Sequence, residues 1–291
     1  MIILKLLKDV VNQFHVTVGD EDDSSASMLS TFLSSMIELL VETPLVEHSY
    51  YLHVEATRML VTLLSSVLYS PGKPCHQLAA WRDMMSGEQA SVMVVPLTCA
   101  LLQRYSDQAP APELDTGGSL VLGLASSVWS ILTLGYGTGG DTGDRPRTLA
   151  DISLQLLLLL TNHCTDTSAF KNPYRDALFS FANACEKTAD TSAQFRLEYP
   201  SLYATLSTSL HTEESTLLLY QLLHSNHKFR SYLLAGSEIE ELVIPILQTL
   251  YTCTVNSEQS NNHHIYMSLI ILLIASEEDL FNQTVHSSIL K

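Results

Sequence analysis

The stretch Ser237-Glu-Ile-Glu-Glu-Leu-Val-Ile-Pro-Ile-Leu247 contains the signals that decide the fold class of this chain. Ser237 and Glu240 have the spacing of a capping box, in which the serine accepts from first-turn amides and the glutamate reaches back to the serine amide. An apolar run from Leu242 to Leu247 follows at once. Pro245 lacks an amide hydrogen, which predicts a kink or a short first segment. Together these features are typical of the start of an α-helix.

Apolar residues recur at helical spacing along almost the whole chain, and the period-2 alternation of strands is nearly absent. The sequence therefore predicts an all-α fold. Glycine, proline and acidic residues predict loops near 19–25, 106–118 and 135–147. Helices are predicted near residues 1–16, 27–42, 47–69, 89–105, 119–134, 148–163, 173–186, 200–210, 214–226, 238–254, 263–275 and 278–290.

The order of these helices predicts an irregular solenoid of the armadillo or HEAT kind, built from stacked antiparallel helix pairs. We expect a single helical-repeat region over residues 1–291. An irregular helix bundle is the alternative, because helix pairs recur at roughly 40 residues without a recurring residue signature. A solenoid presents a long concave face, which suits the binding of another protein better than the enclosure of a small substrate.

Composition excludes several classes of protein. The 291 residues are 46% hydrophobic, so a packed core is expected rather than disorder. The chain has 31 acidic and 15 basic residues, a net charge of -16, so its average surface repels nucleic acid and anionic lipid. Its five cysteines show no CxxC spacing, which argues against a disulfide framework or a zinc module.

Two apolar segments raise the alternative of an integral membrane component, with helices near 120–134 and 263–275 inserted. A membrane-spanning helix needs about 20 mostly apolar residues. The first segment is interrupted by serine and threonine and flanked by glycine, and the second is shorter still. We therefore predict that both segments are helices buried among other helices, and keep insertion as the alternative.

The sequence shows no convincing catalytic or metal-binding pattern. Gly135-Tyr-Gly-Thr-Gly-Gly140 fits a dinucleotide-binding fingerprint, but the acidic, helix-breaking segment after it argues for a connector. The histidine pairs His224/His227 and His263/His264 do not supply three converging ligands, and we expect the second pair to be capping or surface groups. We predict a protein that is not an enzyme and has no metal or cofactor.

The segment Lys171-Asn-Pro-Tyr-Arg175 contains the candidate contact residues. Asn172 as N-cap and Pro173 in the first turn predict the start of a helix. Tyr174 and Arg175 are residue types common in binding hot spots, so both are candidate protein contacts. The alternative for Tyr174 is packing against the next helix.

Several segments, taken in order, resemble the dymeclin family. They include Asn172-Pro-Tyr-Arg175, Leu217-Leu-Leu-Tyr220, the run Leu242 to Leu247, and Asn262-His-His-Ile-Tyr-Met-Ser-Leu-Ile-Ile-Leu-Leu-Ile274. Upstream, Gly123-Leu-Ala-Ser126 with Trp129 fits the same family in the same order. Members are longer at both ends, so the chain looks like a fragment. Met1-Ile2 does not match the family's Met-Gly start.

The resemblance implies a helical, non-catalytic, cytoplasmic protein that associates peripherally with the Golgi apparatus and supports Golgi organisation and vesicle traffic. Combined with the solenoid prediction, it leads us to expect a protein-interaction scaffold. Its expected partners are other proteins of the Golgi trafficking machinery and not nucleic acid. Membrane association is expected to be indirect or to come from the missing N-terminus.

Overall fold

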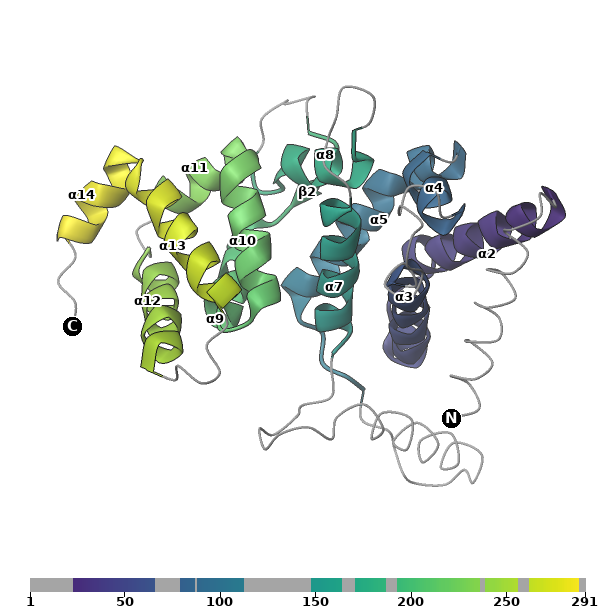
Figure 1. Ribbon diagram of the computed structural model, residues 1–291, viewed down its shortest axis with the longest axis horizontal. Helices are drawn as coiled ribbons and strands as arrows, with labels where there is room; N and C mark the ends of the chain where they lie inside the picture. Colours follow the sequence, from purple (N-terminus) through teal and green to yellow (C-terminus); the bar gives the residue numbers. More distant parts are fainter. Residues whose placement is uncertain are drawn as a thin grey trace. The chain divides into compact units, whose positions relative to one another are not determined.

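The protein is described by a computed structural model, which describes residues 23–65, 79–86, 88–112, 148–163, 171–186, 193–235, 239–255 and 262–287. These residues are helical almost throughout (Figure 1), which confirms the all-α prediction for this part of the chain. The helices are α2 (Asp23–Glu42), the 3-10 turn η1 (Glu47–Ser49), α3 (Tyr50–Leu64), α4 (Ala79–Ser86), α5 (Glu88–Asp107), α7 (Leu149–Asn162), α8 (Pro173–Ser180), α9 (Tyr199–Ser209), α10 (Glu213–Ser225), α11 (His227–Ala235), α12 (Glu240–Val255), α13 (Asn262–Ser276) and α14 (Asp279–Ser287).

Side-chain caps explain where several of these helices begin. Thr212 precedes α10, and its hydroxyl accepts from the Ser215 amide at 3.3 Å. Glu213 and Glu214 lie in the first turn of α10, where carboxylates complement the positive end of the helix dipole. The predicted cap of α12 at Ser237, the helices at 1–16 and 119–134, and the loop at 135–147 lie outside the described residues.

The chain divides into two compact units. Unit 1 consists of Met1–Met84 with Ala109–Ile152, and unit 2 consists of Met85–Gln108 with Ser153–Lys291. In unit 1, Tyr50, Val54, Leu149 and Ile152 form a buried cluster. The Tyr50 hydroxyl accepts from the Leu149 amide at 3.0 Å, which fixes the start of α7 against α3. The single repeat region predicted over the whole chain stays a prediction.

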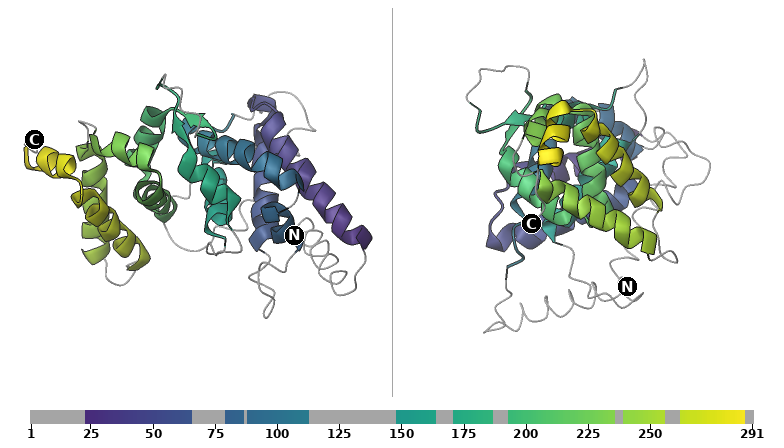
Figure 2. Two further views of the ribbon diagram at one scale, coloured as in Figure 1. Left: turned by 90° about the horizontal axis from the view of Figure 1, so that it is seen from above. Right: turned by 90° about the vertical axis from the view of Figure 1, so that its left-hand side faces the viewer.

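In unit 2, a chain of helix–helix contacts runs from α5 to α14. Helix α5 contacts α8 and α9, α9 contacts α10 and α12, and α10 contacts α11 and α13. Helix α13 in turn contacts α12 and α14 (Figure 2). This succession of pairwise contacts is typical of an irregular helical solenoid. Phe181, Tyr199 and Phe229 form an aromatic centre, with ring centroids 5.1 to 6.2 Å apart.

The predicted helix at 173–186 is too long. Helix α8 ends at Ser180, and Phe181 is extended, with φ −68° and ψ 153°. The Phe181 carbonyl accepts from the Tyr199 hydroxyl at 3.1 Å and from the Asn226 side-chain amide at 3.2 Å, so tertiary partners replace the helical bond. The chain then forms β1 (Ala182–Asn183), which pairs in parallel with β2 (Arg196–Leu197).

Other boundaries agree with the prediction to within a few residues, apart from two short helices, α4 and α11, that the sequence did not predict. Helix α2 begins at Asp23, inside the loop predicted at 19–25, and α5 continues to Asp107, inside the loop predicted at 106–118. Among the described residues, no helix has both the length and the apolar character needed to cross a bilayer. That search includes the helix predicted at 263–275, but residues 120–134 lie outside it.

Candidate protein-interaction surface

The histidines of α10 and α13 have structural partners in unit 2. His264 is buried, and its Nε2 lies 2.9 Å from the Thr216 hydroxyl and 3.3 Å from the Leu210 carbonyl. The prediction that His264 is a capping or surface group is therefore wrong, because its ring ties α13 to α10. His224 is exposed, and its Nδ1 lies 2.8 Å from the Ser225 hydroxyl. In the part of the chain that the structure describes, no group of three His, Cys, Asp or Glu could hold a metal ion.

Asn172 joins the end of α7 to the start of α8. Its Oδ1 accepts from the amides of Tyr174 at 3.0 Å and Arg175 at 3.1 Å. Its Nδ2 donates to the carbonyls of Leu160 at 2.8 Å and His163 at 2.9 Å. One buried side chain therefore satisfies free groups at both helix ends, where four amides and four carbonyls have no intrahelical partner.

The structure separates the two candidate contacts of this segment. Tyr174 is fully buried, as the packing alternative expected, and burial raises the pKa of its phenol. Arg175 is partly exposed, and its Nε donates to the Thr161 carbonyl at 2.9 Å, so it also supports the joint. Tyr174 therefore offers no contact surface in this conformation, whereas a contact role for Arg175 stays a prediction.

The most unusual surface in unit 2 lies on α13. The side of α13 that faces the protein consists of His264, Ser268, Ile271 and Ala275, which are spaced i, i+4, i+7 and i+11. The opposite side carries four large apolar residues spaced i, i+3, i+4 and i+7, which we call the α13 face: Tyr266, Leu269, Ile270 and Leu273. Their exposed fractions are 65%, 50%, 41% and 62%.

This arrangement reverses the usual amphipathic pattern, in which a surface helix buries its apolar stripe and exposes its polar one. Scattered exposed apolar residues are normal on a protein surface, but a contiguous apolar helix face marks an interaction site. The expectation that 263–275 is a core helix is therefore correct for only one side of α13.

Neighbouring helices also expose apolar side chains. On α12, Ile244, Leu247 and Tyr251 are exposed at i, i+3 and i+7, and Tyr251 reaches 72%. On α14, Leu280 and Val285 are exposed. In the right-hand view of Figure 2, α12, α13 and α14 face the viewer with no other described element in front of them.

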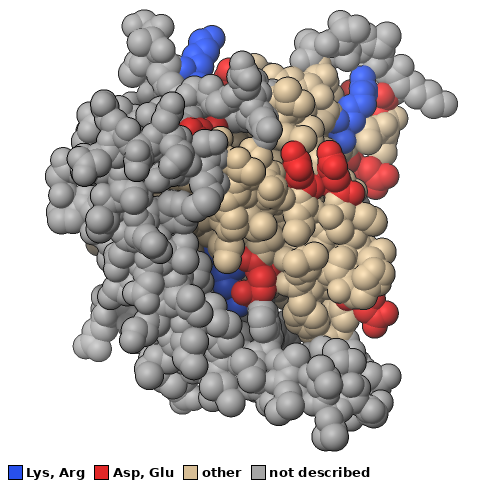
Figure 3. Space-filling model, turned by 90° about the vertical axis from the view of Figure 1, so that its right-hand side faces the viewer, with Lys and Arg blue, Asp and Glu red and all other residues tan. Residues whose placement is uncertain are grey.

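Negative charge accompanies these apolar side chains. Between Arg230 and Lys291 the sequence contains no Lys or Arg, but it contains seven carboxylates, of which the three at Glu277, Glu278 and Asp279 lie where α13 meets α14. The face drawn in Figure 3 differs, because its broad area of uncharged residues is bordered by both acidic and basic groups.

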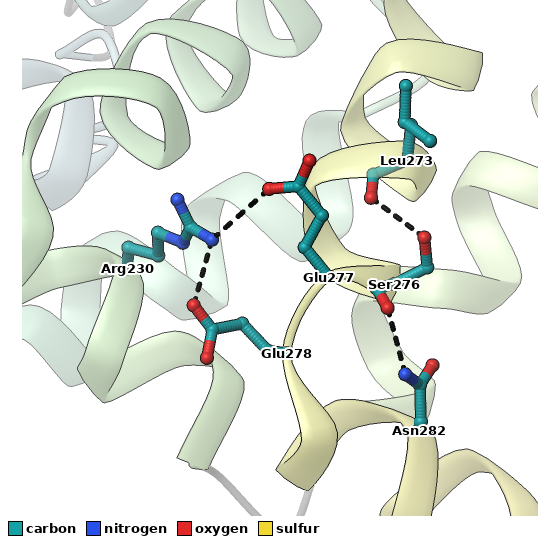
Figure 4. Close-up of polar contacts among 6 residues, drawn as sticks. All are labelled: Arg230, Leu273, Ser276, Glu277, Glu278 and Asn282. Carbon is teal, nitrogen blue, oxygen red and sulfur yellow. Dashed lines mark hydrogen bonds and ion pairs between the residues drawn. The ribbon is translucent and has the colours of Figure 1, made fainter.

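Arg230 of α11 neutralises part of this acidic cluster and fixes the start of α14 (Figure 4). Its Nη2 lies 2.8 Å from Glu278 Oε1 and 3.7 Å from Glu277 Oε2. The Glu277 side chain remains 64% exposed, so its charge is available to an approaching partner. Asn282 Nδ2 donates to the Ser276 carbonyl at 2.8 Å and closes the turn between the two helices.

A depression of about 590 Å³ lies beside the start of α10 and extends to α13. Glu213, Glu214 and His211 line its polar part, and Leu217 and Met267 line its apolar part. The Gln155 amide donates to Glu214 at 3.4 Å. The thiol of Cys99 is partly buried, and burial raises its pKa and so lowers the fraction of reactive thiolate at neutral pH.

The sequence alone did not reveal which side of α13 faces outward. Residues 265–274 are apolar on every side apart from Ser268, so periodicity could not distinguish one face from the other. The signal lay in the small and polar residues His264, Ser268 and Ala275, which share one helix side and permit close approach to a neighbour.

Comparison with known proteins identifies relatives over nearly the whole chain. The family model named Dymeclin, described as Dyggve-Melchior-Clausen syndrome protein, matches residues 7–291. The chain is 39% identical to Dymeclin of Drosophila melanogaster over 282 residues, which cover 91% of this chain and 39% of the relative.

Vertebrate relatives give the same result. Identity is 38% to Dymeclin of Rattus norvegicus, covering 92% of this chain and 41% of the relative. It is 35% to Dymeclin of Mus musculus, covering 100% and 46%. The chain thus spans less than half the length of the curated relatives it matches. No solved structure matches it.

Proposed function

The chain belongs to the dymeclin family, and on that premise we propose that it acts as a non-catalytic interaction scaffold at the Golgi apparatus. In this role it supports Golgi organisation and vesicle traffic by holding other proteins of the trafficking machinery. Its association with the membrane is peripheral and depends on those partners, or on parts of the longer family members that lie beyond this chain.

The observation that carries the proposal is the α13 face. Burying a leucine side chain stabilises a complex by about 1.5 to 3 kcal/mol relative to leaving it in water. Leu269 and Leu273 are 50% and 62% exposed, so about half of this free energy is available to a partner. Aromatic residues such as Tyr266 are enriched among the residues that dominate binding free energies.

The proposal can be tested by crosslinking and mass spectrometry on the full-length protein in cells. The variant Leu269→Glu/Leu273→Glu places two charges on the α13 face. The control Leu52→Glu/Val92→Glu places the same charges at two apolar residues of similar exposure, 50% and 69%, on α3 and α5.

We expect the α13 variant to lose crosslinks to trafficking proteins and to leave the Golgi fraction, and the control to keep both. The scaffold role is wrong if both variants keep the same crosslinks and the same fractionation. Alkaline carbonate extraction tests the peripheral association separately, because a peripheral protein is released from membranes and an integral one is retained.

A further inference from the structure

We infer that the α13 face binds a basic amphipathic helix of a partner protein. This inference rests on the scaffold role proposed above and specifies the chemistry of the partner. Three observations on unit 2 support it: the spacing of the exposed apolar residues, the charge around them, and the character of the side chains that α13 buries.

The spacing suits a helical partner. Tyr266, Leu269, Ile270 and Leu273 form one ridge along α13, since residues three and four apart are neighbours on a helix surface. A second helix packs against such a ridge by placing its own side chains in the adjacent grooves. Recognition of an amphipathic helix by apolar anchors at i, i+3, i+4 and i+7 is a recurring mode of protein binding.

A second ridge runs along α12, which contacts α13. It consists of Ile244, Leu247 and Tyr251, again three and four residues apart. Together the two helices expose seven large apolar side chains in a region that the described part of the protein leaves uncovered. Helix α13 thus buries His264, Ser268, Ile271 and Ala275 on one side and leaves the four large apolar residues of the α13 face exposed on the other.

The charge of this region selects a basic partner. Ser231 to Leu290 contains seven carboxylates and no Lys or Arg. Glu240 and Glu241 begin α12, and Glu277 and Asp279 lie near the end of α13. Lysine or arginine residues flanking the apolar stripe of a partner helix meet these carboxylates at the edge of the interface, where complementary charge speeds association and suppresses wrong partners.

The same charge disfavours two other occupants. An anionic bilayer surface attracts basic helices and repels acidic ones, so the carboxylates beside α13 oppose its insertion among charged headgroups. A second copy of the chain carries the same charge of -16, and symmetric pairing of one face with itself places like charges opposite each other.

The test is binding of a fluorescent synthetic helix to the full chain, measured by anisotropy. The probe peptide has leucine at i, i+3, i+4 and i+7 and lysine on its remaining positions. One control peptide has glutamate in place of every lysine, and another has the same composition with its leucine spacing scrambled.

We expect the lysine peptide to bind, with an affinity that falls as salt is added, and both control peptides to bind at least about tenfold more weakly. The variant Leu269→Ser/Leu273→Ser weakens binding of the lysine peptide about 10- to 100-fold, because two apolar anchors are lost. The control Leu52→Ser/Val92→Ser, which removes two exposed apolar residues elsewhere, leaves the affinity unchanged. Circular dichroism of both variants checks that they fold.

The inference is overturned if the glutamate peptide binds as tightly as the lysine peptide, if the chain without peptide binds anionic phosphatidylserine vesicles through this face, if the chain dimerises through this face, or if the face is already protected from labelling in the full-length protein without a partner. Absence of peptide binding also overturns it. If the in-cell crosslinks nevertheless map to α13, the scaffold role stands and only the partner chemistry is wrong. If those crosslinks are absent as well, both proposals fail.

Discussion

Helices α10 and α13 contact each other, but they use opposite kinds of surface. Helix α10 buries Leu218, Leu219, Leu222 and Leu223, each with no exposed area. Helix α13 turns His264, Ser268, Ile271 and Ala275 toward the protein and exposes Leu269 and Leu273. The difference teaches that the most apolar side of a helix is not always its intramolecular contact side. Small and polar residues can form that contact when they allow close approach and find hydrogen-bond partners, as His264 does with Thr216.

The largest expected effect contrasts one leucine from each helix. Leu222→Ala leaves a cavity in a packed interior, and we expect it to lower the free energy of unfolding by about 2 to 5 kcal/mol. Leu273→Ala removes a side chain that is 62% exposed, and we expect a change within about 0.5 kcal/mol. Urea unfolding of the full chain measures both values. Equal losses of unfolding free energy in the two variants would show that Leu273 is buried in solution and would contradict the proposed difference between α10 and α13.

The second expected effect concerns the close approach of α13 to α10. Ser268 is only 1% exposed, so Ser268→Leu forces extra volume into a packed contact, and we expect a loss of about 1 to 3 kcal/mol. Ser276→Leu places the same side chain at an exposed position of the same helix and serves as the control. Thermal unfolding compares the two variants. A harmless Ser268→Leu would mean that α13 does not pack closely by this side.

The third expected effect concerns the buried hydroxyl of Tyr174, which, unlike the His264 ring, makes no hydrogen bond to a described residue. The Tyr174 hydroxyl is buried, and the described residues offer it no hydrogen-bond partner. Removing an unsatisfied buried hydroxyl relieves a desolvation cost, so we expect Tyr174→Phe to stabilise the protein by about 1 kcal/mol. Urea unfolding at neutral pH checks this. A destabilised variant would indicate that the hydroxyl has a partner in solution.

The pH dependence of stability provides a second measurement on the same variant. Burial raises the pKa of Tyr174, so the native state retains the phenolic proton at a pH where the unfolded chain has released it. The native protein therefore loses stability as pH rises above about 10, by up to about 1.4 kcal/mol per pH unit for one phenol. We expect this loss to be less steep in Tyr174→Phe, and identical slopes would contradict the assignment.

The smallest expected effect concerns the link between α11 and α14. Glu278→Gln removes the closer of two ion pairs with Arg230, but the carboxylate is 46% exposed, so we expect a cost of only about 0.5 kcal/mol. Added salt should destabilise the native protein more than the variant, which retains only the longer Arg230–Glu277 pair at 3.7 Å. Hydrogen exchange on α14 measures the local effect. A loss several times larger would make this link, and not apolar packing, the main support of α14.

Much of the fold could be predicted because helical periodicity is a local property of the sequence. The two helices that were missed are short, and each follows a break in the pattern. Helix α11 begins after Asn226, whose Oδ1 accepts from the Phe229 amide at 3.0 Å while its Nδ2 reaches the Phe181 carbonyl. The Asn226 side chain acts at a helix junction as the Asn172 side chain does. The sequence predicts a helix start only after Asn172, because Pro173 follows it. The end of α8 at Ser180 was not predictable from local signals, since distant residues satisfy the Phe181 carbonyl.

The candidate surface was less predictable than the fold. Hot-spot residue types pointed to Tyr174, whose ring is buried, since residue type says nothing about whether a neighbouring helix covers it. The α13 segment was correctly recognised as helical and strongly apolar, but its orientation depends on contacts with α10 that lie about fifty positions away in the sequence, such as Thr216 with His264. Acidic composition, in contrast, is a property of the whole sequence, and it argued against nucleic acid and anionic lipid as partners without knowledge of the fold.

Because the α13 face is apolar, the stability of this protein in cells should depend on the concentration of the partner that covers the face. A newly made copy without its partner displays an apolar ridge of the kind that chaperones hold and degradation systems select. Cells that lack the partner should therefore contain less of this protein, even with unchanged synthesis. Loss of the partner would then reduce the amount of both proteins.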